Sequence, residues 1–294
     1  MTKSAKIQFE QFSNHNSHGA FMSRFFWLDN LDTDLREHVL FSLRVIWTQS
    51  SNALEGNTFS EGDTLFFLKE GLTVSGKTLQ EHLDIQGYSD AVKLLAEMAV
   101  GDNPLCEQDI FRLHRLVQTE KLNDVYRPVG AWKREDNGTQ IEDDNGKIIW
   151  HKYPSCEETP RLMKQWIDKF SQLSPQTRND AVLCYAKAHL SFVFIHPFFD
   201  GNGRMARLLA NFPLLRNGFP PIIISGNDRR AYLHFCYAFQ KAAKTPFLND
   251  ADCAEFAAFL DKQWHETLRI INEAHEIQDK RHNLKKSSVV SNEI

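Results

Sequence analysis

A short segment, His196 to Arg207, brings together residue types that suit chemistry on a phosphate group; it reads HPFFDGNGRMAR. The imidazole of His196 can accept a proton as a general base, and the carboxylate of Asp200 can hold a divalent cation. Gly201 and Gly203 permit positive φ angles, so successive backbone N–H groups can point at one anion. These residues therefore predict a phosphate site with a base and a metal ligand beside it.

Two arginines follow the glycines, at the start of an expected helix. Arg204 and Arg207 lie in its first turn, where the macrodipole is positive and a cation costs about 0.3–1 kcal/mol. No acidic residue occurs from Arg204 to Arg216, so neither arginine has a partner within the helix. We therefore expect both arginines to meet an anion or a carboxylate from elsewhere in the chain.

Each of these residues also has an ordinary structural interpretation. A histidine before proline often caps a helix or packs, an aspartate before glycine often forms a turn, and Gly-Asn-Gly is a common turn. The features converge within one loop, however, and this convergence favours a functional site over unrelated structural roles.

A second candidate lies upstream, in Ser51 to Gly56. Ser51 and Glu55 are four residues apart on one helix face, and Glu55 precedes a glycine of the kind that commonly ends helices. An acid in the last helical turn opposes the macrodipole. Glu55 also lacks a local partner. Glu55 and Arg207 would stabilise each other if they met; the alternative is an exposed glutamate at a fraying helix end.

The elements that must position these residues are mainly α-helical. Apolar residues recur at helical spacing in residues 35–54, 65–72, 85–98, 107–118, 162–173, 180–195, 204–215, 231–243 and 254–271. Pro197 disfavours the α conformation at His196, and Asn217-Gly218 supplies a stop signal for the helix after the glycines. One β-hairpin is expected around Asn145-Gly146, the pair that type I′ turns prefer. The polar residues 281–294 are expected to form a frayed tail.

Composition and charge exclude several classes of protein. The 294 residues carry a net charge of −4, which argues against a surface built to bind nucleic acid or an anionic membrane. The five cysteines are scattered without a Cys-x-x-Cys pair, and the N-terminus lacks the apolar stretch of a secretory signal; both features favour a reducing cytoplasm. No run of about 18 apolar residues suggests a membrane span.

The segment from His196 to Arg207 resembles the motif of the Fic family of nucleotide transferases, His-x-Phe-x-Asp/Glu-Gly-Asn-Gly-Arg-x-x-Arg, and fills each of its fixed positions. The similarity extends from about Gln108 to Ala243. It implies an N-terminal helical region at residues 1–103, a Fic-type helical core with one β-hairpin flap at 104–245, and a C-terminal helix with a polar tail at 246–294. Most members transfer AMP from ATP to a Ser, Thr or Tyr hydroxyl of a target protein and release pyrophosphate. The resemblance therefore implies a protein adenylyltransferase.

The resemblance also implies a role for each residue of the motif. His196 would remove the proton from the target hydroxyl, Asp200 would hold a Mg²⁺ cofactor between the α and β phosphates, and Phe198 would anchor the loop. The remaining positions would bind the phosphates of ATP; they are Gly201, Asn202, Gly203, Arg204 and Arg207.

Ser51 to Gly56 resembles the family's inhibitory signature, Ser/Thr-x-x-x-Glu-Gly/Asn, which implies that Glu55 holds Arg207 away from the γ phosphate. The segment Gly138 to Tyr153 matches the hairpin flap, which aligns the target's backbone as an added strand; the alternative is a plain surface hairpin. The aligning residues would be Thr139, Gln140 and Ile141.

The resemblance also concerns Tyr232 and the segment of residues 130–133. Tyr232 resembles an aromatic residue that borders the adenine pocket, and the alternative is a half-buried core residue. Gly130-Ala131-Trp132-Lys133 departs from the family's Gly-x-Tyr-Arg, so contacts with the target are expected to differ on that side.

Two other functions fit the same residues. Glu55 could orient a water that removes AMP from a modified target. The loop could instead belong to a non-catalytic module that binds nucleotide, although an intact His196 argues against this. The sequence does not identify the target protein, and the chain itself is one candidate. No helix-turn-helix follows the core, so direct DNA binding is not expected, and a homodimer is compatible with the family resemblance alone.

Overall fold

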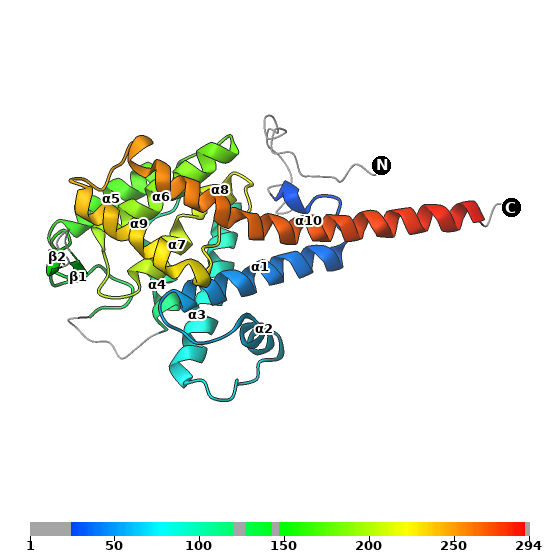
Figure 1. Cartoon of the computed structure of the whole chain (residues 1–294), viewed down its shortest axis with the longest axis horizontal. Helices are drawn as coiled ribbons and strands as arrows, with labels where there is room; N and C mark the ends of the chain where they lie inside the picture. Colours follow the sequence, from blue (N-terminus) through cyan, green and yellow to red (C-terminus); the bar gives the residue numbers. More distant parts are fainter. Residues whose placement is uncertain (1–24, 120–126, 143–146, 292–294) are drawn as a thin grey trace.

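The computed structural model describes residues 25–119, 127–142 and 147–291 and is mainly helical, as the sequence predicts. Its helices are α1 Thr33–Ala53, α2 Glu61–Glu70, α3 Leu79–Val100, α4 Glu107–Gln118, α5 Thr159–Phe170, α6 Arg178–Ile195, α7 Asn202–Leu209, α8 Phe212–Arg216, α9 Arg229–Ala242 and α10 Ala254–Ser291. Its strands are β1 Gly138–Glu142 and β2 Ile148–Lys152. Helices α1 and α10 lie side by side and extend from one end of the body, and the hairpin lies at the other end (Figure 1).

Helix α6 runs through the centre of the core. Buried residues cover all its sides, and α5, α7, α8, α9 and α10 pack around it. The helix begins at a capping box, in which the Thr177 hydroxyl and the Asp180 carboxylate each accept a hydrogen bond from the other residue's backbone N–H. Because α6 is enclosed, the residue at its C-terminal end is carried by a rigid element.

The helix expected at residues 204–215 is interrupted, and this expectation was wrong. Helix α7 ends at Leu209 and α8 begins at Phe212, so that Pro213 lies in the first turn of α8. Within one continuous helix, proline would remove a backbone hydrogen bond and clash with the preceding turn. The Asn211 side chain bridges the break, since its Nδ2 donates to the Arg207 and Ile222 carbonyls.

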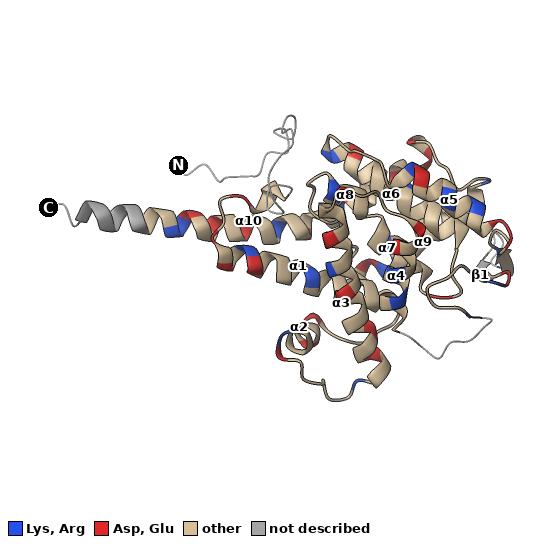
Figure 2. Ribbon diagram, turned by 180° about the vertical axis from the view of Figure 1, so that it is seen from behind, with Lys and Arg blue, Asp and Glu red and all other residues tan. Residues whose placement is uncertain are grey.

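The C-terminal residues do not form the expected frayed tail, because α10 continues from Ala254 to Ser291. Charged residues of both signs line α1 and α10 (Figure 2). Gln278 Oε1 accepts from the Asp32 backbone N–H at 2.8 Å, and Arg281 pairs with Asp34 at 2.7 Å. These contacts support α10 as far as Arg281, and the helix then continues past the start of α1 (Figure 1).

The expected hairpin forms, with β1 and β2 antiparallel and Gly138 opposite Lys152. The predicted turn residues Asn145 and Gly146 lie outside the described residues. The division at residues 103 and 104 stays a prediction, although α3 packs directly on α4 and α8. Within the described ranges, no helix is both long and apolar enough to cross a bilayer.

Candidate active site

His196 lies at the C-terminal end of α6, where the sequence predicts that the helix stops. Its backbone is left-handed, with φ 49°, and its N–H donates to the Phe192 carbonyl at 2.9 Å. The half-buried imidazole stacks on Tyr153, with 3.7 Å between ring centroids and 2° between planes. Burial and the nearby Lys133 ammonium lower the pKa of His196 to about 3. The imidazole is therefore neutral near pH 7 and able to accept a proton.

The loop after His196 is folded by its own asparagine. Asn202 Oδ1 accepts from the Phe198 N–H at 2.9 Å, and Asn202 Nδ2 donates to the Phe198 carbonyl at 2.8 Å. Phe198 is fully buried and stacks on His114 at 3.7 Å. The Asn202 side chain thus holds the loop closed, and only its backbone N–H remains as a candidate phosphate donor.

The two glycines of the loop meet close neighbours. Gly201 has φ +77°, and a Cβ there would lie 2.1 Å from Gln118 Nε2. A Cβ on Gly203 would lie 2.5 Å from Glu55 Oε1. The left-handed backbone therefore requires glycine at Gly201, whereas Gly203 is helical and lacks the positive φ that the sequence suggested. The Glu55 carboxylate rests directly over Gly203.

Asp200 presents an exposed carboxylate at the start of the glycine loop. Its Oδ1 accepts from the Gly201 N–H at 2.7 Å, and its carbonyl contacts His114 Nε2 at 3.1 Å. The Gly130 N–H donates to His114 Nδ1, so the ring hydrogen is on Nε2 and donates to Asp200. His114 is thus a neutral residue that fixes the loop, and sequence reasoning missed it.

Mg²⁺ fits the chemistry of Asp200. This ion prefers oxygen ligands and is usually held by one or two carboxylates together with substrate phosphates. In the part of the chain that the structure describes, no group of three or more His, Cys, Asp or Glu residues could hold a metal alone. One carboxylate beside a phosphate loop is consistent with that mode of binding.

Arg204 finds its partners on neighbouring helices, as expected from the lack of acids in its own. Its Nη1 donates to the Val117 carbonyl at 3.1 Å and to Asp84 Oδ1 at 3.3 Å. The side chain is buried between α3, α4 and α7. Its predicted contact with pyrophosphate stays a prediction.

Arg207 is almost fully buried and is surrounded by acceptors. Its Nη2 donates to Glu55 Oε1 at 2.7 Å and to the Ser51 carbonyl at 2.8 Å, and its Nε donates to Ser51 Oγ at 3.0 Å. Its Nη1 donates to the Tyr232 hydroxyl at 3.0 Å. The glutamate and the arginine that lacked local partners therefore meet each other.

Tyr232 lies beside Arg207 and is buried. Its hydroxyl accepts from Arg207 and is 3.0 Å from His189 Nε2. Burial lowers the pKa of His189 to about 3, so this ring is neutral and accepts from the Tyr232 O–H. His189 was missed because a histidine on a helix that is apolar on all sides gives no distinct signal. The adenine-pocket role of Tyr232 stays a prediction.

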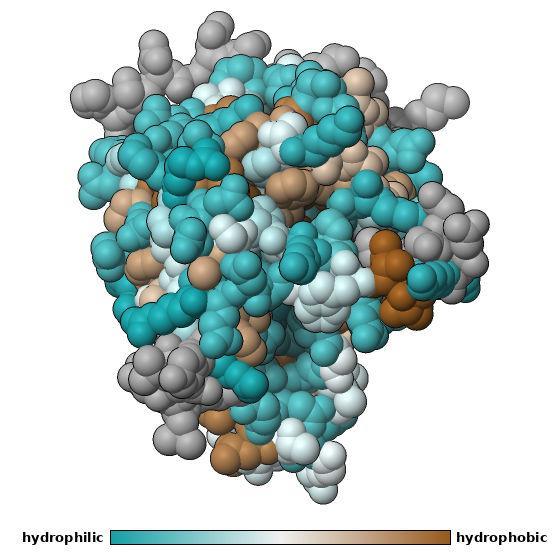
Figure 3. Space-filling model, turned by 90° about the vertical axis from the view of Figure 1, so that its left-hand side faces the viewer, coloured by the Kyte–Doolittle hydropathy of each residue, from teal (hydrophilic) through white to brown (hydrophobic). Residues whose placement is uncertain are grey.

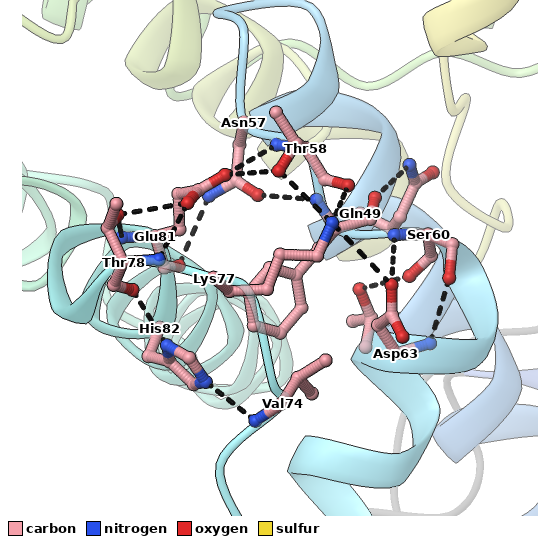
Figure 4. A network of polar contacts seen from close by, with 12 residues as sticks. Gln49, Asn57, Thr58, Ser60, Asp63, Val74, Lys77, Thr78, Glu81 and His82 are labelled. Atoms are coloured by element: carbon pink, nitrogen blue, oxygen red, sulfur yellow. Dashed lines mark hydrogen bonds and ion pairs between the residues drawn. The ribbon is translucent and has the colours of Figure 1, made fainter.

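The segment after Glu55 is tied to the start of α3 by a polar cluster of Asn57, Thr58, Lys77 and Glu81 (Figure 4). Glu81 Oε1 accepts from both the backbone N–H and the hydroxyl of Thr58, and its carbonyl accepts from Asn57 Nδ2. The Lys77 ammonium donates to the Thr58 carbonyl. Hydrogen bonds from the Thr58 hydroxyl and from the backbone N–H groups of Thr78 and Thr58 lower the pKa of Glu81 to about 2. The cluster fixes the chain immediately beyond the predicted inhibitory residue.

The hairpin carries exposed residues at the other side of the site. Thr139 is half-buried and Gln140 is exposed, whereas the Ile141 side chain lies outside the description. On β2, Ile148 and Trp150 are 58% and 59% exposed. Figure 3 looks at this end of the molecule and shows strongly hydrophobic side chains among hydrophilic ones. The hairpin therefore offers an apolar surface next to His196.

Comparisons with known proteins agree with this geometry. Residues 104–214 match the model of the Fic/DOC family. "Protein adenylyltransferase Fic" of Nematostella vectensis is 30% identical over 238 residues, which cover 78% of this chain and 53% of that protein. The protein of the same name from Drosophila grimshawi is 34% identical over 70% of this chain and 40% of that protein. A Fic domain containing signaling protein from Bacteroides thetaiotaomicron has a similar structure, with a TM-score of 0.73, 28% identity, and coverage of 86% of this chain and 94% of that one.

Fold and site define a helical protein whose glycine loop precedes a helix N-terminus, the arrangement that binds phosphate. Residues 104–214 form a Fic domain, as the match to the Fic/DOC family model and the similar structure of the Bacteroides thetaiotaomicron protein indicate. The chain spans about half or less of the length of the curated relatives that it matches.

Proposed function

We propose that the protein transfers AMP from ATP to a Ser, Thr or Tyr hydroxyl of a target protein and releases pyrophosphate. The observation that carries this proposal is the placement of a neutral His196 beside a glycine loop that opens helix α7. A carboxylate, Glu55, already lies over Gly203, where a phosphate oxygen would meet the loop. The relatives named as adenylyltransferases support the same reaction.

His196 acts as the general base in this reaction. Its Nδ1 is buried, so the ring accepts the hydroxyl proton at Nε2. The hydroxyl oxygen then forms a bond to the α phosphorus, and the bond from that phosphorus to the bridging oxygen of pyrophosphate breaks. Catalysis rests on positioning and on charge stabilisation.

The glycine loop and the arginines hold the phosphates. The backbone N–H groups of Gly201, Asn202 and Gly203 stand at the positive end of α7. Within the described part of the chain, Arg204 Nε and Gln118 Nε2 are buried donors without an acceptor, which suits a site for an anion. Mg²⁺, held by Asp200 with phosphate oxygens, would offset the charge that develops on the leaving group.

Glu55 restrains this activity in the proposed mechanism. The γ phosphate and the Glu55 carboxylate are both anions that would bind the same face of Arg207, and Ser51 holds the guanidinium on the side of α1. Because 44% of the Glu55 side chain is exposed, the carboxylate can leave without opening the core. The protein is thus an autoinhibited transferase.

The hairpin supplies the binding edge for the target. We assign Thr139, Gln140 and Ile141 the alignment of the target's backbone, and the exposed Ile148 and Trp150 support contact with a protein. The target can be another protein or a second copy of the chain. All five cysteines are free, which supports a reducing compartment such as the cytoplasm.

Labelled ATP with Mg²⁺ and the Glu55→Gly variant tests this function. The variant is expected to label itself or a protein in lysate much faster than the wild type does. Glu70→Gly is the matched control, since Glu70, like Glu55, directly precedes a left-handed glycine but lies exposed on α2. A Glu55→Gly variant that binds ATP and transfers no label would refute the proposal.

Removal of AMP is the second candidate, because Glu55 lies close enough to the glycine loop to orient a water near the α phosphate. Release of AMP from a modified target by the wild type, and its loss in Glu55→Gly, would favour removal. A non-catalytic module would instead be indicated if His196→Ala bound ATP normally and no activity depended on His196.

A further inference from the structure

Lys133 is a buried lysine at the base of the hairpin, and its side chain points inward. Only 3% of the residue is exposed, and lysine is rarely buried without partners. The departure from the family's Gly-x-Tyr-Arg pattern therefore affects the interior of this chain, not a contact of Lys133 with the target.

The Lys133 ammonium binds three segments at once. Its Nζ donates to Asn137 Oδ1 and to the Pro154 carbonyl, both at 2.7 Å, and contacts the Ile195 carbonyl at 3.5 Å. Asn137 immediately precedes β1, Pro154 follows β2, and Ile195 is the last residue of α6. One side chain thus joins both ends of the hairpin to the helix that carries His196.

Further hydrogen bonds extend this connection past His196. The Lys133 backbone N–H donates to the Pro197 carbonyl at 2.9 Å. Asn137 Nδ2 donates to the Phe198 carbonyl at 3.0 Å. The catalytic loop is therefore bound to the hairpin base both before and after His196.

The charge of Lys133 also acts on His196. The ammonium lies 6.0 Å from the centre of the Tyr153 ring, which stacks on His196. It opposes protonation of the imidazole, as His151 does to a smaller extent, while Asp200 favours protonation.

Lys133 itself has a shifted pKa. Burial lowers it to about 8, against the opposing charges of Asp136, Cys156 and Glu158. These groups keep the ammonium charged at neutral pH, where the proposed transfer would run.

We propose that Lys133 is a positioning residue for AMP transfer, which fixes the hairpin base and His196 in one geometry. A target hydroxyl aligned along the hairpin then reaches the base at hydrogen-bond distance. This inference rests on the proposed function. A small misplacement of reacting groups lowers rates steeply, and a loss of about 100-fold is a reasonable scale for it.

Lys133→Met and Lys133→Arg, made in the Glu55→Gly chain, test the proposal. We expect Lys133→Met to lower kcat for target labelling about 10- to 100-fold, with the Kd of a non-hydrolysable ATP analogue unchanged. Lys133→Arg, which restores charge and donors, should recover part of kcat. Lys187→Met is the matched control, because Lys187 is a half-buried lysine near the middle of α6 that pairs with Asp250, and it should leave kcat unchanged.

NMR titration of the His196 ring gives a readout that needs no transfer activity. In folded Lys133→Met, His196 should protonate at a higher pH than in the parent chain. If the Met variant does not fold by circular dichroism, Lys133→Gln keeps amide donors without charge and should show the same shift.

The two hypotheses fail in different ways. A Glu55→Gly chain that transfers nothing refutes the function, whereas the titration still tests Lys133. Unchanged kcat and an unchanged His196 titration in the Lys133 variants would overturn the inference, and so would an equal loss in Lys187→Met.

Discussion

Arg207 and Glu55 lie 152 positions apart in the sequence, and their side chains meet with 2.7 Å between Nη2 and Oε1. The two partners differ in exposure, since 3% of the Arg207 side chain and 44% of the Glu55 side chain reach solvent. The buried arginine therefore needs an anion beside it, whereas another anion can replace the exposed carboxylate of Glu55.

Gly203→Ala should abolish nucleotide binding even when Glu55 is removed. The new methyl group would lie 3.2 Å from Arg207 Nη1 and would cover the backbone over which Glu55 now rests. Isothermal titration with an ATP analogue in the Glu55→Gly chain measures the effect. Gly62→Ala is the control, since the nearest atom to a Cβ there is 3.9 Å away. Equal ATP affinity in Gly203→Ala and its parent would contradict the assigned phosphate loop.

Tyr232→Phe should destabilise the fold and disturb the orientation of Arg207. The lost hydroxyl joins Arg207 Nη1 to His189 Nε2, and both buried groups would lose a partner at a cost of about 1–3 kcal/mol. Urea unfolding measures this change in free energy. Tyr237→Phe on the same helix is the control, because Tyr237 is 41% exposed. Equal stability of the two variants would refute a buried role for the Tyr232 hydroxyl.

His114 should make the protein lose stability in acid. Burial lowers its pKa to about 4 in the folded chain, against about 6.5 in an unfolded chain. As the pH falls, the unfolded chain binds the proton first. Stability is therefore retained above about pH 6.5 and lost between about pH 6.5 and 4, at about 1.4 kcal/mol per pH unit for this group.

Urea unfolding of His114→Gln at several pH values checks this expectation. The slope of unfolding free energy against pH should become shallower by about one proton between about pH 6 and 5. His265→Gln, at an exposed site on α10, should keep the wild-type slope. An unchanged slope in His114→Gln would show that this ring titrates equally in both states.

Glu81→Ala should partly activate the proposed transfer of AMP, although Glu81 does not contact Arg207. The substitution removes the acceptor for both Thr58 donors and frees the segment that follows Glu55. Labelling with ATP should be faster than in the wild type and slower than in Glu55→Gly. Glu61→Ala, an exposed glutamate in the first turn of α2, serves as the control. Activity of Glu81→Ala at the wild-type level would show that the polar cluster does not restrain Glu55.

The sequence allowed the loop and the meeting of Glu55 with Arg207 to be predicted, because neither residue had a partner within its own segment. The expectation that both residues oppose a helix dipole was wrong, since Arg207 lies in the last turn of the short helix α7 and Glu55 lies beyond the end of α1 at Ala53. The sequence did not reveal His114 or Lys133. These two buried residues form hydrogen bonds with backbone carbonyl groups of segments that are distant in the sequence. The spacing of residues along the sequence gives no information about such contacts. The continuation of α10 was missed in part for a related reason, since Gln278 and Arg281 are held by Asp32 and Asp34 at the start of α1.

The pairing of α1 with α10 has a consequence for distances along the helix axis. Glu55 lies two residues beyond the end of α1, and one residue of helix corresponds to a rise of about 1.5 Å. A displacement of that size along the line of the contact would lengthen the 2.7 Å distance beyond hydrogen-bond range. The contacts of Gln278 with Asp32 and of Arg281 with Asp34 hold the start of α1 against α10. Residues of the C-terminal helix therefore help to fix the position of a carboxylate in the proposed active site.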